Sequence, residues 1–476
     1  MKQSIGQGRP GTAIPPDNSH PLLLETITKF IAPDSIDQVL RQVSRNRRRR
    51  CRQRRIPPAA VIWLVLMMGL RSDLEIPSMW RQLYGLVRQM LARLSGIKPP
   101  TKSALSQARK RLGARPMRQL LLLSSRTGCA ERFSYTHYHG MKLLAMDGDS
   151  YSLPDTPANA KAFGRPGTSR DGTPLAGGYP QMHVNRLMSV GTRICLDAIV
   201  KPYNTNDHVS APYLLKQAPA GSLLLWDCGY YSFSLLHQAC QQNKFFVGPV
   251  PDHAVIKSIQ RLGDGSYLAR IYACPNDRRD DRGGLLLRVI EYTLDDPARV
   301  GCGERHRLIT NLLDEQKHPA AELITLYHQR WEIEIDNDEI TTHQLNRAVE
   351  LRSRTPAGVV QEMYGVLLAH NAIRAVMHEA ARQVDIDPRT LSFMHAVRIV
   401  REMIPVMRAA ATEQLPLLYR AMLVEIAAGR LPPRDGRINP RVVKVVRPSN
   451  FPVKKPEHRL WPQPKRPFSE SIVILN

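Results

Sequence analysis

The spacing of apolar residues predicts helices in the first part of this 476-residue chain. Residues 21–43, 77–94 and 102–112 repeat apolar positions at helical spacing, whereas residues 59–70 are apolar on every side. A helix without a polar face must be surrounded by other elements. We therefore predict a helical bundle with residues 59–70 at its centre.

From residue 142 the pattern changes to short apolar runs separated by turn residues, which is typical of strands. The first run ends at Asp147, and the later ones cover residues 181–189, 193–200, 222–226, 244–250 and 305–313, with a helix at 210–217. Residues 251–304 hold three more strand-like runs punctuated by Gly, Asp and Arg. They indicate a β insertion within a mixed α/β part of the chain.

Helical patterns return after the strands. Residues 319–343 form one predicted helix, and Thr355 and Pro356 provide an N-cap and a first-turn proline for the next. Further helices are predicted over residues 359–383, 391–411 and 415–428. Beyond Gly429 the chain is rich in proline and basic residues, which is typical of an extended arm or of a segment without fixed structure.

Positive charge is concentrated at the two ends of the chain, whose net charge is +25. Residues 1–135 hold 25 Lys and Arg against 7 Asp and Glu, and residues 430–476 hold 11 against 3. Residues 45–55 contain eight arginines in eleven positions, among them Arg47, Arg48, Arg49 and Arg50. A solvated basic linker is one interpretation. The other is a strong, salt-sensitive and sequence-independent grip on nucleic acid.

Seven cysteines occur singly, without a Cys-x-x-Cys pair, so neither a zinc site nor a disulfide framework is expected. The longest apolar run, residues 59–70, is too short to span a bilayer. The first residues lack the apolar core of a signal peptide. We expect a cytoplasmic protein that does not enter a membrane.

The helix predicted after the strands carries a polar stripe on one face. Successive helical residues turn by about 100°, so Tyr327, Arg330 and Glu334 lie within roughly 60° of one another. Asp338 and Thr341 extend the stripe. A weak surface pair between Arg330 and Glu334, of about 0.3–0.5 kcal/mol, is one explanation. A site in which Glu334 holds a metal ion and its neighbours hold a phosphate is the other.

Two strand ends offer further acids. Asp147 and Gly148 follow the first apolar run, where Asp149 and Asp155 compete for the same role, and Asp227 ends a later run. A hairpin turn also explains Asp147 and Gly148, and a turn alone explains Asp227. If a fold brings Asp147, Asp227 and Glu334 together, their oxygens suit two Mg²⁺ ions about 4 Å apart.

These motifs resemble those of the insertion-sequence family four transposases, which are bacterial DDE enzymes. The Tyr327, Arg330 and Glu334 spacing matches the family's signature, and Asp147 precedes a similar LPDTPAN segment. Asp227 opens DCGYYS, which resembles the family's second Asp motif. The segments IPPAAVIWLVLMMGL and SALSQARKRLG resemble its N-terminal domain, so the resemblance covers roughly residues 35–450.

The resemblance implies a ribonuclease-H-like α/β catalytic core with a β-strand insertion. An all-α DNA-binding domain would precede this core, and helices and a basic tail would follow it. The corresponding boundaries are 1–135 for the helical DNA-binding domain, 136–250 and 305–383 for the two parts of the core, 251–304 for the insertion, 384–429 for the C-terminal helices and 430–476 for the Pro-rich tail.

It also implies the chemistry and the partners. Asp147, Asp227 and Glu334 would hold two Mg²⁺ ions, with Mn²⁺ expected to substitute, and cut and join double-stranded DNA at terminal inverted repeats and a target. A homodimer is expected in the DNA complex, associated with the bacterial nucleoid. The residues expected to contact DNA are Tyr327, Arg330, Arg47, Arg48, Arg49, Arg50, Arg109, Lys110 and Arg111.

The chain departs from the family's pattern at two positions. Thr341 stands where relatives have a Lys, and Cys228 stands where they usually have a basic residue after the second Asp. These departures leave two alternatives to an active transposase. One is an impaired or co-opted transposase that only binds DNA, and the other is a structure-selective nuclease on the same fold.

Overall fold

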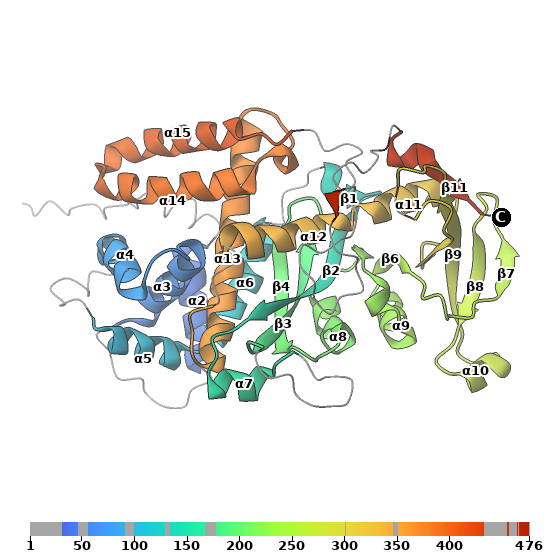
Figure 1. Ribbon diagram of the computed structural model, residues 1–476, viewed down its shortest axis with the longest axis horizontal. Coiled ribbons are helices and arrows are strands. Elements are labelled where there is room, and N and C mark those ends of the chain that lie inside the picture. The colour runs from blue at the N-terminus through green and yellow to red at the C-terminus, as the bar shows by residue number, and fades with distance from the viewer. Residues whose placement is uncertain are drawn as a thin grey trace, which may run out of the picture.

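The computed structural model describes residues 31–45, 56–90, 100–128, 134–166, 178–299, 301–345, 351–432, 455–456, 464 and 466–475. A large mixed sheet lies beside a bundle of helices (Figure 1). Most of the arginine run and most of the basic tail, including Arg47 to Arg50, lie outside the described residues. No helix in the described ranges is long and apolar enough to cross a bilayer.

The helices are α2 (Pro33–Arg45), α3 (Pro58–Leu70), α4 (Ile76–Met90), α5 (Lys102–Leu112), α6 (Arg115–Gly128), α7 (Pro157–Phe163), α8 (Asp207–Gln217), α9 (Phe233–Gln241), α10 (Pro275–Arg279), α11 (Ala320–His328), α12 (Trp331–Asp338), α13 (Pro356–Gln383), α14 (Phe393–Ala409) and α15 (Leu415–Ala428). A π-helical segment, η4 (Glu339–Gln344), continues α12. The helices predicted over residues 59–70 and 102–112 are confirmed as α3 and α5, and α3 is buried from its third residue onward. Of the helices predicted over 21–43 and 77–94, residues 33–43 and 77–90 are helical, while residues 21–30 and 91–94 lie outside the described residues.

The strands are β1 (His137–Tyr138), β2 (Met141–Ser152), β3 (Gln181–Ser189), β4 (Cys195–Pro202), β5 (Leu223–Leu225), β6 (Phe245–Pro249), β7 (Ser258–Arg261), β8 (Tyr267–Ile271), β9 (Leu285–Leu294), β10 (His306–Thr310) and β11 (Ile472–Ile474). Their order in the sheet is β4-β3-β2-β5-β6-β10-β9-β8-β7, with β1 on β2 and β11 on β9. The strands predicted for the middle of the chain are confirmed.

Strands β3 to β6 flank β2, the strand that carries Asp147. β2 pairs antiparallel with β3 and parallel with β5, and β5 runs parallel to β6. Leu143 and Leu144 on β2 enter different apolar clusters, and both are almost fully buried. A central strand with a parallel neighbour is normally covered on both faces. The first half of β2, which leads to Asp147, is therefore held in place by packing from both sides.

The β insertion is continuous with the main sheet, because β9 pairs antiparallel with β10. Strand β11, from the basic tail, adds to the same β9. The tail was expected to be an extended arm or to lack fixed structure, and its last described residues instead extend this part of the sheet.

The helix predicted over residues 319–343 is not continuous. Its first part, α11, ends at His328, where Arg330 N–H donates to the Tyr327 carbonyl three residues back. α12 begins at Trp331 and changes into the π-helical η4 at Glu339. π-helical turns are rare, and they occur frequently at functional sites. Trp331, the first residue of α12, is 43% exposed although it is a large aromatic residue.

Helix α13 joins the bundle to the sheet. It packs on α3, α6, α14 and α15 and also contacts β4 (Figure 1). Its N-cap is Thr355, as predicted, whose hydroxyl accepts from the Gly358 N–H. At the crossing with α3, a Cβ on Gly69 would lie 2.3 Å from the Gly365 carbonyl oxygen. The two backbones approach so closely that no side chain fits between them.

We expect Gly365→Ala to lower the free energy of unfolding by about 1–3 kcal/mol, because its Cβ would lie 2.5 Å from the Val65 carbonyl oxygen. Denaturant unfolding measures the change. Gly263→Ala is the control, since nothing lies within 4 Å of its added Cβ. Equal stability of the Gly365→Ala protein and the wild type would contradict the close crossing.

Candidate active site

Asp147 lies within β2 and not at its end. The strand continues to Ser152 and stays paired with β3, so the hairpin-turn interpretation of Asp147 and Gly148 is wrong. A Cβ on Gly148 would lie 2.4 Å from His183 Nε2 and 2.5 Å from Asp207 Oδ1. Gly148 is therefore required by the close approach of two side chains, and not by a turn.

The register of β2 and β5 places Asp147 beside Asp227. Ala145 is paired with Leu225 across the two parallel strands, and each Asp comes two residues later. Parallel neighbours in register present these positions side by side, here where β5 ends and β2 continues along β3. Asp227 is further fixed by its own turn, in which its carboxylate accepts from the Gly229 N–H at 2.9 Å.

Glu334 reaches this edge from α12. Arg330, one turn earlier, donates from Nη2 to Glu334 Oε1 at 2.9 Å. One turn later, Asn337 Nδ2 donates to Asp147 Oδ2 at 3.2 Å, which ties the helix to the strand. Only 14% of the Arg330 side chain is exposed. The pair is therefore largely buried, unlike the solvated surface pair considered from the sequence.

Two of the three acids, Asp147 and Asp227, have raised pKa values. Burial, and then the Asp227 carboxylate, raise the pKa of Asp147 to about 6. Burial also raises the pKa of Asp227, and Glu334 adds to this effect while Arg330 opposes it. Mutual repulsion among partly buried acids is relieved when a cation binds between them.

Tyr327 and Arg330 complete the group. Burial raises the pKa of the Tyr327 phenol, and the Asp227 carboxylate acts in the same direction. Burial acts against the charge of Arg330, yet Tyr327, Glu334 and Asp147 raise its pKa. The structure thus brings five sequence-predicted residues into one electrostatic environment.

The basic residues expected on α5 separate into two kinds. Arg109 is buried, and its guanidinium donates to Gln361 Oε1 at 2.9 Å and to Ser353 Oγ at 2.8 Å. The expected DNA contact of Arg109 is thus replaced by a link between α5 and the start of α13. Lys110 and Arg111 are exposed on the same helix.

Sequence reasoning missed two residues beside the site. Asn337 lies three residues after Glu334, so the helical stripe could have revealed it. Asp207 raises the pKa of Asp227, and its Oδ1 lies 2.6 Å from His183 Nε2. No sequence signal indicates Asp207, because only the packing of α8 against the sheet places it there.

The donor set Asp147, Asp227 and Glu334 suits a hard divalent cation, which prefers carboxylate oxygens. Among the residues that the structure describes, Asp336, Glu339 and His370 are the one group whose potential ligand atoms all lie within 4.8 Å of one another, so Asp147, Asp227 and Glu334 are less tightly gathered. Asp336 and Glu339 both form ion pairs with buried arginines, whereas in the first group Glu334 pairs with Arg330. The two groups lie on different faces of the α12–η4 segment.

Comparisons with known proteins agree with this geometry. Residues 138–372 match the family described as the transposase DDE domain, and residues 21–121 match the insertion element 4 transposase N-terminal family. The transposase InsG of insertion sequence element IS4 from Escherichia coli K12 is 29% identical over 408 residues, covering 84% of this chain and 88% of InsG. InsZ from the same strain is 32% identical over 188 residues, 39% of this chain and 58% of InsZ.

A piggyBac transposase synaptic complex with hairpin DNA, solved by cryo-electron microscopy, is similar to this chain with a TM-score of 0.42 and 12% identity. That similarity covers 84% of this chain and 85% of the piggyBac chain. The matching families define a DDE transposase, an enzyme that cleaves and transfers DNA strands. The chain belongs to the insertion-sequence four (IS4) family of these enzymes.

The raised pKa of Asp147 predicts a pH-dependent gain in stability from Asp147→Asn when metal is removed by chelation. Above about pH 6 the ionised, partly buried acid costs the folded state free energy that Asn does not. Below the ordinary value of 3.8, Asp147 is neutral in both states and this difference disappears. We expect a gain of about 1–3 kcal/mol at pH 7.5.

Denaturant unfolding at pH 7.5 and pH 4 measures this gain. Glu402→Gln, on the exposed side of α14, is the control and should change stability by the same small amount at both values. A gain from Asp147→Asn that is equal at both pH values would show that burial and Asp227 do not raise the pKa of Asp147.

Proposed function

We propose that this transposase binds the terminal inverted repeats of its element, cuts DNA at their ends and joins the 3′-hydroxyls to a target. The register of β2 and β5 carries the proposal, because it sets two acids side by side while α12 supplies the third. The order and directions of β2 to β6 support a ribonuclease-H-like core. Two copies on paired ends would fit the dimer expected from the sequence.

Asp147, Asp227 and Glu334 are the proposed metal ligands, and Mg²⁺ is the proposed ion, with Mn²⁺ as a substitute. Two such ions, when bound, activate the attacking water or hydroxyl and stabilise the leaving oxygen. Arg330 has donors left besides the one on Glu334, so it can also hold a non-bridging phosphate oxygen. Tyr327, protonated at neutral pH, can donate one further hydrogen bond to the strand.

Positive charge outside the core is assigned to DNA binding. Lys110 and Arg111 are exposed on α5, and the arginines at 47–50 are expected to act with them. Exposed guanidinium and ammonium groups hold phosphates without reading base sequence. The DNA-binding-only alternative is not favoured, because the families and the relative that match this chain are transposases.

Asp147→Asn, Asp227→Asn and Glu334→Gln should each reduce Mg²⁺-dependent cleavage of an element-end duplex by about 100-fold to 1000-fold or more. Each change removes a ligand charge and keeps the side-chain volume. Binding of the same duplex in a chelating buffer should stay close to that of the wild type. Glu402→Gln makes the same chemical change as Glu334→Gln on an exposed helix face and should leave cleavage unchanged.

A variant that still cuts at the wild-type rate would remove its residue from the site. Strand joining is scored in the same assay with a target plasmid. Cutting of branched or unrelated DNA without joining would instead indicate a structure-selective nuclease.

Thr341→Lys should raise the cleavage rate by about 3- to 10-fold, because the new ammonium group would add one partly exposed contact to a DNA phosphate. Thr341 extends the stripe of Arg330 and Glu334, and its hydroxyl donates only to the Asn337 carbonyl at 2.8 Å. Thr342→Lys is the matched control, because it adds the same charge about 90° around the helix. An equal rise in both variants, or none, would mean that another basic residue already fills this position.

A further inference from the structure

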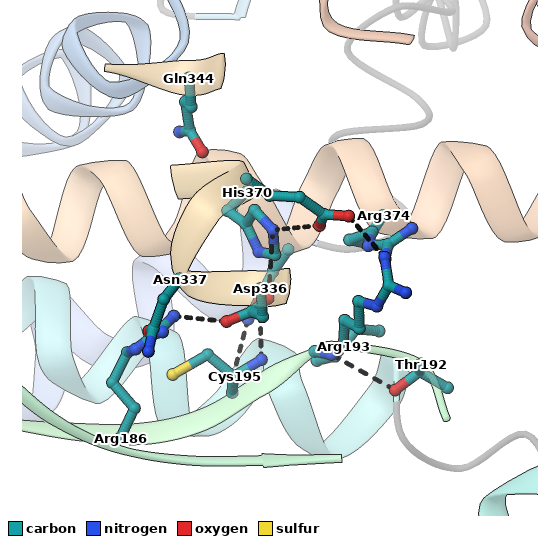
Figure 2. Close-up of polar contacts among 12 residues, drawn as sticks. Arg186, Thr192, Arg193, Cys195, Asp336, Asn337, Gln344, His370 and Arg374 are labelled. Atoms are coloured by element: carbon teal, nitrogen blue, oxygen red, sulfur yellow. Dashed lines mark hydrogen bonds and ion pairs between the residues drawn. The ribbon is translucent and has the colours of Figure 1, made fainter. Parts of the chain in front are cut away.

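A cluster of buried charges lies on the side of α12–η4 that faces away from Glu334. It consists of Asp336, Glu339, His370, Arg374, Arg186 and Arg193, and each of them is at most 4% exposed. Figure 2 shows Asp336 and His370 facing each other, with Arg186 on one side and Arg193 and Arg374 on the other. The cluster joins the helix to strand β3, to the turn after β3 and to α13.

Asp336 is the centre of the first half of the cluster. Its Oδ2 accepts from Arg186 Nη1 at 2.5 Å, and its Oδ1 lies 3.3 Å from His370 Nε2. His370 Nε2 also lies 3.2 Å from Glu339 Oε2, so one imidazole links two acids three residues apart. Every one of these side chains is at least nine-tenths buried, so the geometry is fixed by packing as well as by charge.

Glu339 is the centre of the second half. Its Oε1 accepts from Arg193 Nη1 at 2.6 Å and from Arg374 Nη2 at 3.1 Å. Arg193 reaches back to Glu332, whose Oε2 accepts from Nε at 2.7 Å. Glu332 thus pairs with an arginine from the turn after β3 and not with a neighbour on its own helix.

With the neighbouring Glu332 included, the acids and arginines of the cluster balance without a metal ion. The carboxylates of Glu332, Asp336 and Glu339 meet three guanidinium groups, those of Arg186, Arg193 and Arg374. A divalent cation would add two uncompensated positive charges to a closed interior, which is strongly unfavourable. Asp336 and Glu339 are therefore spaced to pair with the buried arginines, and not to bind a metal ion with His370.

The cluster is connected directly to the proposed metal ligands. Arg186 is the residue opposite Asp147 in the β2–β3 pairing, and the next residue after Asp336, Asn337, donates to Asp147. Glu334 lies only two residues before Asp336. Neighbouring residues thus fasten the helix to β2 on one side and to β3 on the other.

The far end of the segment is held as well. Gln344, the last residue of η4, donates from Nε2 to the Gly69 carbonyl at 3.1 Å and to the Val366 carbonyl at 2.9 Å. Arg401 Nη2 donates to the Gln344 carbonyl at 3.0 Å. Helices α3, α13 and α14 therefore fix the end of the same segment whose beginning carries Glu334.

We propose that Asp336, Glu339 and His370 are positioning residues, which act through the helix to hold Glu334 at a fixed place relative to Asp147 and Asp227. This inference rests on the proposed role of Glu334. A displacement of about 1 Å at a reacting centre can cost roughly 100-fold in rate, so a rigid attachment has a large effect without touching DNA.

Asp336→Asn is the main test, because it keeps the shape of the side chain and leaves Arg186 without its counter-ion. Asp197→Asn is the matched control. Asp197 is also fully buried and paired with an arginine, Arg118, but it joins α6 to β4. Three quantities are measured on the full chain: hydrogen exchange of residues 331–345 without DNA or metal, affinity for an element-end duplex in a chelating buffer, and single-turnover cleavage in Mg²⁺.

We expect Asp336→Asn to accelerate exchange in residues 331–345, to leave DNA affinity within about 2-fold and to lower cleavage by about 100-fold. Asp197→Asn should lower the melting temperature without changing exchange in that segment or the cleavage rate per folded molecule. If Asp336→Asn does not fold, His370→Leu replaces it, since Leu fills the space of the imidazole but offers Asp336 and Glu339 no donor, and the same three results are expected.

Wild-type cleavage by a folded Asp336→Asn protein would overturn the proposal. So would a loss of cleavage with unchanged exchange in residues 331–345, because Asp336 would then act by another route. Calorimetric binding of Mn²⁺ to Asp227→Asn protein that is lost when His370→Gln is added would make the cluster a metal site instead. If Glu334→Gln cuts normally, the proposed function fails, while the exchange result still reports whether the cluster fixes the segment.

Discussion

The repulsion between partly buried carboxylates is the constraint on which the site depends. Asp147 and Asp227 lie side by side because their strands are parallel and in register, and each raises the free energy of ionising its neighbour. A chain accepts such a cost only where the surrounding structure fixes both positions. Here the sheet is buried on both faces, so the acids cannot move apart.

Glu334, the third acid, lies on a helix and not on a strand of the sheet. Backbone pairing therefore does not fix its position, and side-chain contacts must do so. The α12–η4 segment carries two sets of polar residues. Arg330, Glu334 and Asn337 face the strand ends, and Asp336 and Glu339 face the buried arginines. Removing one member of a buried ion pair typically costs about 3–5 kcal/mol, so the second set resists displacement of the first.

The helical bundle is not separate from this arrangement. Helix α3 crosses α13 at the contact of Gly69 with Gly365, and the Gly69 carbonyl also accepts from Gln344 at the end of η4. The same helix α13 carries His370 and Arg374. A rigid path of packed backbone thus connects the N-terminal helices to the segment that presents Glu334.

The sequence by itself determined the local elements and the candidate acids, because apolar spacing reports burial and the stripe of Tyr327, Arg330 and Glu334 needs only helical geometry. It could not determine where β2 ends, that the last helix breaks near Arg330 and turns π-helical at Glu339, or that Trp331 is exposed and Arg109 buried. Those outcomes depend on partners far away in the chain. Tertiary packing alone supplied the arginines of the buried cluster and the neighbour Asp207, since no local pattern pairs a helix with a strand 150 residues away.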